Sequence, residues 1–215
     1  MTINLLNRKF FERETIVVAK EMIGKKLVRL FRTDSTIIKL AGIIVETEAY
    51  GYLDDKASHA FKGMNSRNRY MFGDVGYSYV YFTYGNHYCF NVSAHTKTKD
   101  AGAVLIRAIE PILGINMMIK NRKKIDILNL TSGPGKMTKA LAIDKKDNGI
   151  DITDSNSTIY LEDTIVSNVV LSTKRIGIEM DKDKYWRFIY AEKDRGKIVI
   201  NRYVSRKKEN TKFLE

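Results

Sequence analysis

The stretch Y-S-Y-V-Y-F-T-Y-G-N-H-Y-C-F-N-V-S, residues 77–93, gives the first indication of the fold. Aromatic and β-branched residues, which favour strands, are frequent in both of its halves. Between the halves, Gly85-Asn86-His87 contains residue types that favour turns. The stretch therefore predicts two antiparallel strands, over residues 77–84 and 88–93, joined as a β-hairpin.

Hydrophobic spacing and turn residues predict further elements on both sides of this hairpin. Strands are expected over residues 26–32, 37–48, 103–109, 158–161, 173–178, 187–190 and 197–200. Helices are expected over residues 12–23, 66–72, 111–118 and 136–143, with Pro111 at the start of the third. This order predicts an α+β fold. We expect one compact domain over residues 1–215, with a mainly antiparallel curved sheet, flanking helices and a protruding β-hairpin.

The charge balance favours a polyanionic partner. The chain has 37 lysines and arginines against 25 aspartates and glutamates, which gives a net charge of +12 and a pI near 9.6. Nucleic acid or an anionic membrane surface would attract such a protein. A basic ribosomal or coat protein would have the same charge, so the charge alone does not decide between these classes.

Other features predict a location inside the cell. Cys89 is the only cysteine, which excludes an internal disulfide and fits a reducing compartment. No apolar stretch approaches the ~18 residues of a membrane span. The first nine residues lack the basic-then-apolar order of a secretory signal. We therefore expect an intracellular protein that does not cross a membrane.

Motifs for phosphate and metal binding are incomplete. The segment G-P-G-K, residues 133–136, lacks the earlier glycine of a P-loop, and Met137 replaces the required Ser or Thr. His87, Cys89 and His95 lie near one another but match no zinc-binding spacing. Cys89, between aromatic residues, is more typical of a small core residue than of a nucleophile. The sequence therefore predicts neither a metal nor a cofactor.

Two carboxylates end the expected strand over residues 37–48. In an extended segment Glu46 and Glu48 point to the same side, and Ile44 shares that side. A carboxylate at this transition from core to polar residues would be partly desolvated, which raises its pKa and suits a general base. A pair of solvated charges at a strand end remains the alternative.

Tyrosines alternate along the first strand of the hairpin. Tyr77, Tyr79 and Tyr81 share one face, and each phenolic hydroxyl needs a hydrogen-bond partner if it is buried. Such faces suit stacking on nucleobases. Tyr84, beside the expected turn, could project as a wedge between base pairs. A tyrosine ladder with a purely structural role remains the alternative.

The order of these segments resembles the alkyladenine (3-methyladenine) DNA glycosylase family. The matching blocks are E-A-Y at 48–50 with His59, R-N-R-x-M-F at 67–72, Y-V-Y-x-x-Y-G at 79–85, and Y-C-x-N at 88–91. V-L-I-R-A-x-E-P at 104–111 and G-P-G-K at 133–136 with A-L at 140–141 also match. The resemblance covers residues 10–199, nearly the whole chain.

The resemblance implies a monofunctional DNA glycosylase, which flips damaged purines out of the duplex and hydrolyses the N-glycosidic bond to start base excision repair. The expected lesions are of the 3-methyladenine, 7-methylguanine and hypoxanthine type. Glu48 matches the general base that activates water, and Arg107 would lie behind Glu48 near the substrate phosphates. No lysine matches a nucleophile position, so lyase activity is not expected.

The resemblance also implies a base-binding pocket. Tyr50 and Tyr81 would sandwich the flipped base, and His59 would cap the pocket with hydrogen bonds to base or sugar. Asn91 and Leu105 would narrow the pocket so that the exocyclic amino groups of ordinary purines clash. The chain departs from the family just after Tyr50, where Tyr52-Leu53 replace part of the usual Gly-Pro segment.

The partner that the resemblance implies is double-stranded DNA containing damaged purines, bound by a monomer. Tyr84 matches the residue that enters the duplex and fills the vacated space. Lys136, at the expected start of a helix, is the candidate for contacts with the DNA backbone. Two alternatives remain: a non-catalytic DNA- or RNA-binding protein that retains the fold, and a basic structural protein of a ribonucleoprotein.

Overall fold

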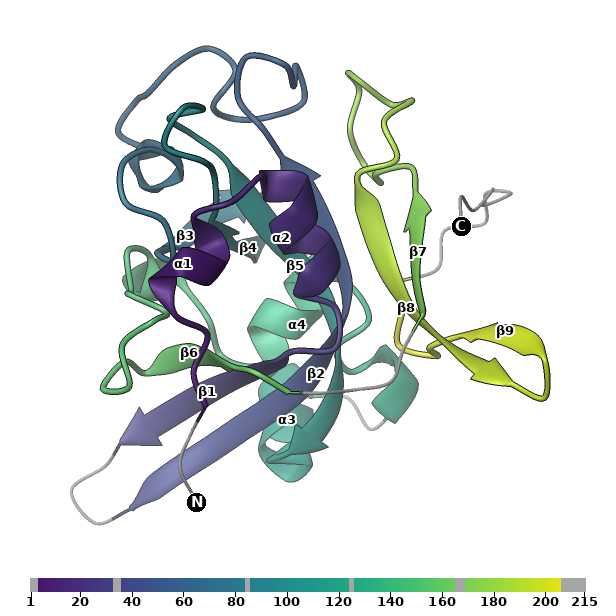
Figure 1. The fold of residues 1–215 in the computed structure, drawn as a ribbon. Helices are drawn as coiled ribbons and strands as arrows, with labels where there is room; N and C mark the ends of the chain where they lie inside the picture. The colour runs from purple at the N-terminus through teal and green to yellow at the C-terminus, as the bar shows by residue number, and fades with distance from the viewer. Residues whose placement is uncertain (1–3, 33–35, 84–85, 124–125, 165–168, 206–215) are drawn as a thin grey trace.

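The strands of the protein form one curled antiparallel sheet. The computed structural model describes residues 4–32, 36–83, 86–123, 126–164 and 169–205. In this part of the chain, nine strands pair in the order β3-β4-β5-β2-β1-β6, while β8 joins β2 and carries β7 and β9 (Figure 1). The strands are β1 Lys26–Arg32, β2 Ile37–Tyr50, β3 Ser78–Thr83, β4 His87–Ser93, β5 Ala103–Leu113, β6 Ile159–Glu162, β7 Val169–Thr173, β8 Arg187–Asp194 and β9 Lys197–Ile200.

The long strand β2 is the centre of this sheet. Its fourteen residues pair with β5 along one edge. Along the other edge, the first half of β2 pairs with β1, and Glu46, Thr47 and Glu48 pair with β8. The ladder between β2 and β5 contains register shifts around Gly42 and around Glu46. Such bulges bend a sheet and increase its twist, which explains how one strand can belong to two differently directed parts of the sheet.

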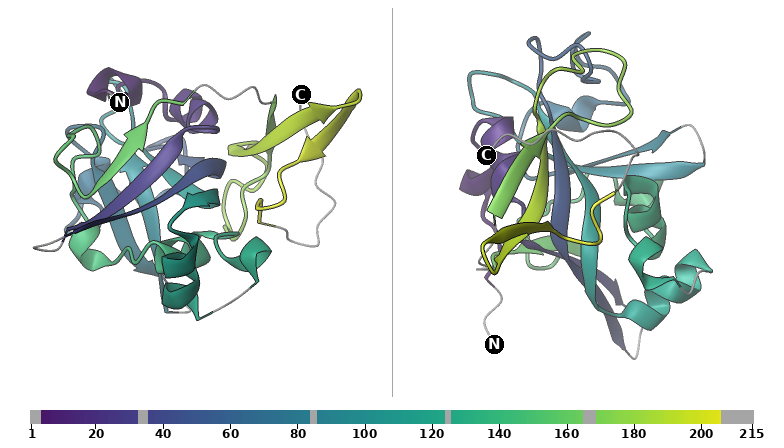
Figure 2. Two further views of the ribbon diagram at one scale, coloured as in Figure 1. Left: turned by 90° about the horizontal axis from the view of Figure 1, so that it is seen from below. Right: turned by 90° about the vertical axis from the view of Figure 1, so that its right-hand side faces the viewer.

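Short helices cover both sides of the sheet (Figure 2). The α-helices are α1 Arg8–Phe11, α2 Thr15–Glu21, α3 Ile115–Arg122 and α4 Pro134–Ala140. Three 3₁₀ turns are η1 Arg69–Met71, η2 Ile127–Asn129 and η3 Lys145–Asp147. In α2, Val18 and Ala19 are fully buried, and the hydroxyl of Thr47 donates to the carbonyl oxygen of Ala19 at 2.7 Å. Because this bond ties α2 to β2, it holds the side of β2 that faces away from the two glutamates.

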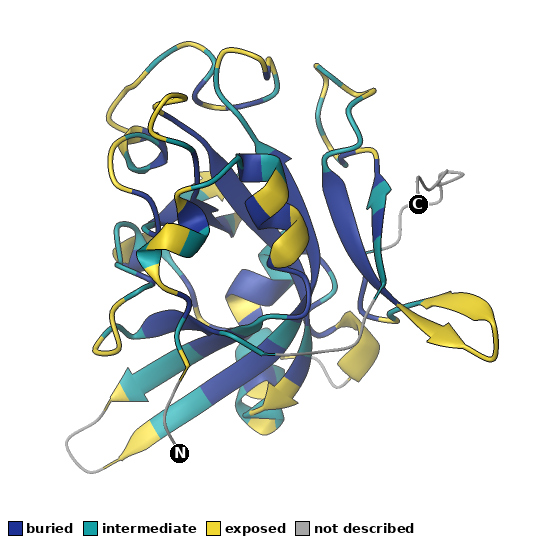
Figure 3. Cartoon of the chain, viewed as in Figure 1, coloured by how far each residue is buried: buried dark blue, intermediate teal, exposed yellow. Residues whose placement is uncertain are grey.

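The core lies along the middle strands and takes in the first five residues of β8, while the far end of β8 and most of β9 are exposed (Figure 3). Phe90, Ile106 and Ile109, from β4 and β5, have no exposed surface. The predicted α+β class with a curled antiparallel sheet and few helices is confirmed. No helix in the part of the chain that the structure describes is long and apolar enough to span a membrane.

The predicted hairpin is confirmed over its described residues. Ser78 to Thr83 pair with Val92 to His87 in an unbroken antiparallel register. Strands 26–32 and 197–200 also have the predicted bounds. Helices 12–23 and 136–143 are shorter than predicted, and of segment 66–72 only Arg69–Met71 is helical, as a 3₁₀ turn. The turn expected at 33–36 lies largely outside the described residues. Of the turn expected at 85–87, Asn86 is a turn residue with φ of 62°, and His87 already begins β4.

Two predicted elements are wrong. Pro111 does not start a helix; it lies in β5 opposite Gly42, beside a register shift, where a strand tolerates the missing N–H group. Gly114, with φ of 74°, ends the strand and precedes α3. The strand expected over residues 173–178 is instead β7, which ends at Thr173. After that residue the chain leaves the sheet, because Arg175 and Ile176 form bonds with side chains of other segments.

Candidate active site

The register of the sheet places a row of predicted site residues side by side. Tyr79 in β3 pairs with Asn91 in β4, and Asn91 pairs with Leu105 in β5. Leu105 in turn pairs with Glu48 in β2, and Glu48 pairs with Arg187 in β8. The row crosses five strands, so residues more than a hundred positions apart meet on one face of the sheet.

Glu46 is the best-satisfied carboxylate in this region. Its Oε1 accepts hydrogen bonds from Arg107 Nε, Arg187 Nε and Ser205 Oγ, each at 2.7 Å, and its Oε2 accepts from the backbone N–H of Ser205 at 2.6 Å. Burial acts to raise the pKa of Glu46, but the two guanidinium groups and Ser205 outweigh it and hold the pKa below its ordinary value. Glu46 is therefore ionised and fully engaged in holding the two arginines.

Glu48 is also fully buried, but its partners differ. Oε2 accepts from the hydroxyl of Tyr50 at 2.8 Å and from Arg107 Nη1 at 3.2 Å, and Oε1 accepts from the backbone N–H of Ile176 at 2.7 Å. Arg107 therefore bridges both glutamates. Burial acts to lower the pKa of Arg107, but Glu48 and Glu46 raise it above its ordinary value, so the bridge is always charged.

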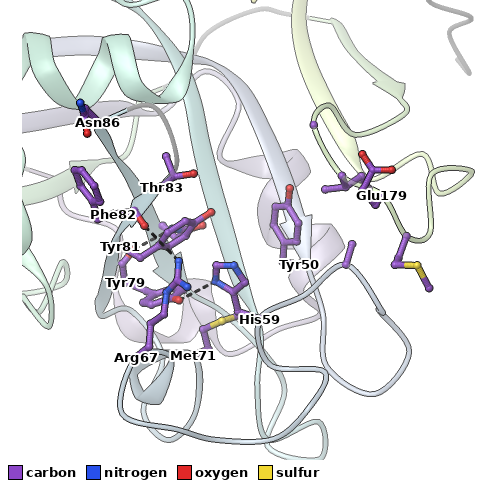
Figure 4. Close-up of a pocket in the computed structure, with 15 residues that line it drawn as sticks. Tyr50, His59, Arg67, Met71, Tyr79, Tyr81, Phe82, Thr83, Asn86 and Glu179 are labelled. Carbon is purple, nitrogen blue, oxygen red and sulfur yellow. Dashed lines mark hydrogen bonds between the residues drawn. The ribbon is translucent and has the colours of Figure 1, made fainter.

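A cleft of about 680 Å³ opens beside these buried charges. Tyr50 lines it opposite Tyr81 and His59, which come from β3 and from the segment after β2 (Figure 4). The His59 ring lies edge-on to Tyr81 at 4.6 Å between centroids, and its Nδ1 lies 2.9 Å from the hydroxyl of Tyr79. The cleft therefore joins three of the predicted base-binding residues, with Glu48 one hydrogen bond behind Tyr50.

The polar groups of the cleft are uncharged at neutral pH, apart from Arg67 and Glu179 at its rim. Burial raises the pKa of Tyr50 well above its ordinary value, and the charge of Glu48 adds to this effect. Burial likewise raises the pKa of Tyr81. For His59, burial lowers the pKa below 6.5 and the positive charge of Arg67 lowers it further. A neutral imidazole and neutral phenols can both donate and accept hydrogen bonds, as a nucleobase requires.

Of the other predicted site residues, some line the cleft and some do not. Asn91 lines it, with its side-chain N–H₂ donating to the carbonyl oxygen of Tyr79 at 2.9 Å. Leu105 is buried beneath the lining and does not reach it. Lys136 lies at a separate surface groove, where Nζ donates to Asn129 Oδ1 at 2.9 Å. The wedge predicted at Tyr84 falls outside the described residues.

Tyr52 and Cys89 have structural roles. Tyr52 packs against Phe72 with 5.4 Å between ring centroids, and Leu53 is exposed. The departure from the family pattern at this point leaves His59 in the cleft. Cys89 pairs with Tyr81 in the register and is buried, and burial raises the pKa of its thiol. Cys89 therefore remains a protonated core residue.

Sequence reasoning missed the residues that come from the C-terminal third of the chain. Arg187 and Ser205 bind Glu46, the Ile176 N–H binds Glu48, and Arg175 forms a buried ion pair with Asp55. In a chain with 37 basic residues, two arginines show no distinguishing pattern. Within the described residues, no group of three or more His, Cys, Asp or Glu side chains is arranged to hold a metal ion.

The pKa of Glu46 leads to a prediction about acid stability. A folded-state pKa below the ordinary value of 4.5 means that ionised Glu46 stabilises the fold above pH 4.5. This contribution is lost as the pH falls through the lowered pKa. We expect Glu46→Gln to flatten that part of the pH profile of the free energy of unfolding, measured by urea titration between about pH 7 and about pH 3. Equal acid slopes for the variant and the wild type would contradict the prediction.

Comparison with known proteins agrees with this geometry. The sequence model of the methylpurine-DNA glycosylase (MPG) family matches residues 9–194. A protein of Francisella tularensis subsp. tularensis is 46% identical over 181 residues, 81% of this chain and 89% of its own length. A protein of Carboxydothermus hydrogenoformans is 42% identical over 205 residues, 94% of this chain and all of its own length. Both are named "Putative 3-methyladenine DNA glycosylase". The chain therefore belongs to the methylpurine-DNA glycosylase family.

Proposed function

We propose that the protein is a monofunctional DNA glycosylase that hydrolyses the N-glycosidic bond of alkylated or deaminated purines, of the 3-methyladenine, 7-methylguanine and hypoxanthine type, and so starts base excision repair. The observation that carries this proposal is the aromatic cleft between Tyr50 and Tyr81, with Glu48 one hydrogen bond behind it. Family membership and the names of the relatives support the same activity.

The cleft suits a purine that has left the duplex. Tyr50 and Tyr81 offer two aromatic faces, and His59 and Asn91 offer polar groups at its sides. Alkylation at N3 or N7 makes a purine cationic, and a cation is attracted to the faces of aromatic rings. Flipping costs a few kcal/mol, least where damage has weakened pairing, so selection begins before the base reaches the cleft.

Glu48 is the proposed general base. A carboxylate has about four acceptor positions, and three on Glu48 are filled by Tyr50, Arg107 and the Ile176 N–H. In the proposed mechanism the fourth accepts a hydrogen bond from the attacking water. The water oxygen then bonds to the sugar carbon, its proton passes to Glu48, and the electrons of the glycosidic bond leave with the purine. The same negative charge stabilises the oxocarbenium-like sugar in the transition state.

Water, rather than a lysine, is the proposed nucleophile. The described residues that line the cleft include Arg67 but no lysine. A lyase reaction requires an amine that forms a Schiff base with the sugar, so the proposal includes no strand cleavage. The proposed product is therefore an abasic site in an otherwise intact strand.

Double-stranded DNA is the proposed partner of a monomeric enzyme. A second groove, of about 890 Å³, is lined by Lys136, Lys139 and Arg122 and shares Asn86 with the cleft. These cations support the proposed contact of Lys136 with the DNA backbone, in keeping with the net charge of +12. Tyr84 is proposed, from the family resemblance alone, to fill the space that the flipped base vacates.

Excision from defined duplexes tests the proposal. Single-turnover assays use duplexes with one 3-methyladenine analogue, 7-methylguanine, hypoxanthine or ethenoadenine, followed by alkaline cleavage of abasic sites. Excision of at least one lesion is expected. Tyr81→Ala should slow it by roughly tenfold to a hundredfold, because a stacked base gains about 1–3 kcal/mol from an aromatic face. Tyr77→Ala is the control, since Tyr77 stacks on Arg8 and does not line the cleft.

The same assay separates the alternatives. A non-catalytic protein that retains the fold would bind the duplexes and leave no abasic site. A structural ribonucleoprotein component would bind RNA at least as tightly as DNA, without regard to damage. Either result would overturn the proposed activity. If the wild type cleaved the strand without alkali, water would not be the nucleophile.

A further inference from the structure

A buried ion pair lies against the cleft but outside the residues expected to act there. Arg175 and Asp55 form two parallel bonds, Nη1 to Oδ2 and Nη2 to Oδ1, each 2.7 Å long. Neither side chain is exposed to solvent. Burial acts to lower the pKa of Arg175, but Asp55 raises it above its ordinary value, so the guanidinium stays charged. A bidentate pair of this kind fixes both distance and orientation.

The guanidinium of Arg175 lies over two aromatic rings. Its central carbon is 4.8 Å from the ring centroid of Tyr50 and 5.2 Å from that of Trp186. Tyr50 lines the cleft, whereas Arg175 does not. Arg175 therefore supports Tyr50 from the protein side, and the cleft remains open to a base. By contrast, Arg67, 5.2 Å from the Tyr81 ring, is exposed and lines the cleft.

Arg175 also connects the parts of the chain that build the cleft. Its Nη1 donates to the carbonyl oxygen of Ala49, the residue before Tyr50, at 2.9 Å. Asp55 accepts from the N–H groups of Gly51 and Ala57, so it closes the segment that leads to His59. Ile176, which follows Arg175 in the chain, donates its N–H to Glu48. The segment after it, residues 177–180, forms one wall of the cleft.

We propose that Arg175 is a positioning residue, which Asp55 holds so that its guanidinium fixes Tyr50 from behind and sets the Ile176 N–H against Glu48. This inference rests on the proposed function. It deepens that function, because it assigns to Arg175 the alignment of the Tyr50 ring, which binds the purine, with Glu48, which activates water. Arg175 touches neither base nor water; it acts through Tyr50 and Ile176.

The test compares binding with excision in a variant that leaves no lone buried charge. Arg175→Gln combined with Asp55→Asn removes both charges together, because one change alone would leave its partner unpaired. We expect affinity for undamaged duplex to change by less than about threefold, since phosphate contacts supply most of it. The single-turnover excision rate should fall roughly tenfold to a hundredfold, because misplacement by about 1 Å can cost that much.

A second ion pair provides the matched control. Arg29 and Asp147 are bonded at 2.6 Å, are nearly buried, and the Arg29 guanidinium lies 4.9 Å from the ring of Phe31. Arg29→Gln with Asp147→Asn should lower the free energy of unfolding by a similar amount and leave excision within about threefold of the wild type. Equal excision losses in the two double variants would show that Arg175 is merely structural and overturn the inference.

Arg175→Lys keeps the test decisive if the double variant does not fold. Lysine retains the charge beside Asp55, but its ammonium cannot form both bonds or lie over the Tyr50 ring as a planar guanidinium does. We expect it to bind duplex normally and excise slowly; wild-type excision by this variant would overturn the inference. If the wild type excises no lesion of the panel, the proposed function fails. If the wild type excises a lesion and the Arg175 variants excise it equally fast, only the role of Arg175 fails.

Discussion

Replacing Glu48 with Gln should abolish most excision while leaving DNA binding intact. Glutamine has nearly the shape of glutamate, and its carbonyl oxygen can still accept from the Ile176 N–H or from Arg107. It cannot take a proton from water or offset positive charge on the sugar. Loss of a general base commonly costs about 10²–10⁴-fold in rate, so we expect a fall of this order in the single-turnover rate.

The control for this variant is another ion-paired glutamate of the sheet that does not line the cleft. Glu162 in β6 is buried and bonded to Lys39 at 3.0 Å. Glu162→Gln should therefore excise at close to the wild-type rate. Affinity for lesion-containing duplex, measured by fluorescence anisotropy, should remain within about threefold for both variants. Undiminished excision by Glu48→Gln would remove Glu48 from the role of general base.

Replacing Arg107 with Met should cause the largest loss of stability. Arg107 bonds to both Glu46 and Glu48, and all three side chains are buried. Without it, Glu48 keeps only uncharged donors and Glu46 keeps only Arg187 as a cation. Removing one partner of a buried ion pair commonly costs about 3–5 kcal/mol, so we expect a loss of this size in the free energy of unfolding.

Chemical unfolding in urea measures this loss, with an exposed ion pair as the comparison. Arg13 pairs with Glu21 on the surface, and Arg13→Met should cost no more than about 1 kcal/mol. The deficit of Arg107→Met should also narrow at acidic pH, since protonation of Glu46 removes a buried charge that has lost one of its two cations. A deficit that stays the same on acidification would mean that lost packing, rather than buried charge, is the cause.

The alternation of residues predicted the common face of Glu46 and Glu48, but not what each of them binds. Period-two alternation requires only local backbone geometry, so it can be read from adjacent residues. The different partners of the two carboxylates depend on Arg107, Arg187, Ser205 and Ile176, which come from distant parts of the chain. Only Arg107 among these was expected, through the family resemblance.

The two wrongly predicted elements show where tertiary contacts override local sequence preferences. Pro111 is a residue type that often starts a helix, yet here it continues β5 because the bulge opposite Gly42 requires no N–H bond from it. Residues 173–178 alternate like a strand. Beyond Thr173, however, Arg175 binds Asp55 and the Ile176 N–H binds Glu48 instead of a neighbouring strand, and no local pattern indicates that.

The order of the strands has a consequence for altering lesion range by directed evolution. Tyr50 and Tyr81 lie on β2 and β3, which β5 and β4 separate, so a flat sheet would place these strands about 14 Å apart. Only the curl of the sheet brings the two rings to face one cleft. The register shifts of β2 around Gly42 and Glu46 contribute to that curl, since bulges bend a strand and increase its twist. Selection for larger or smaller bases should therefore enrich substitutions at these bulges, as well as among residues that touch the base.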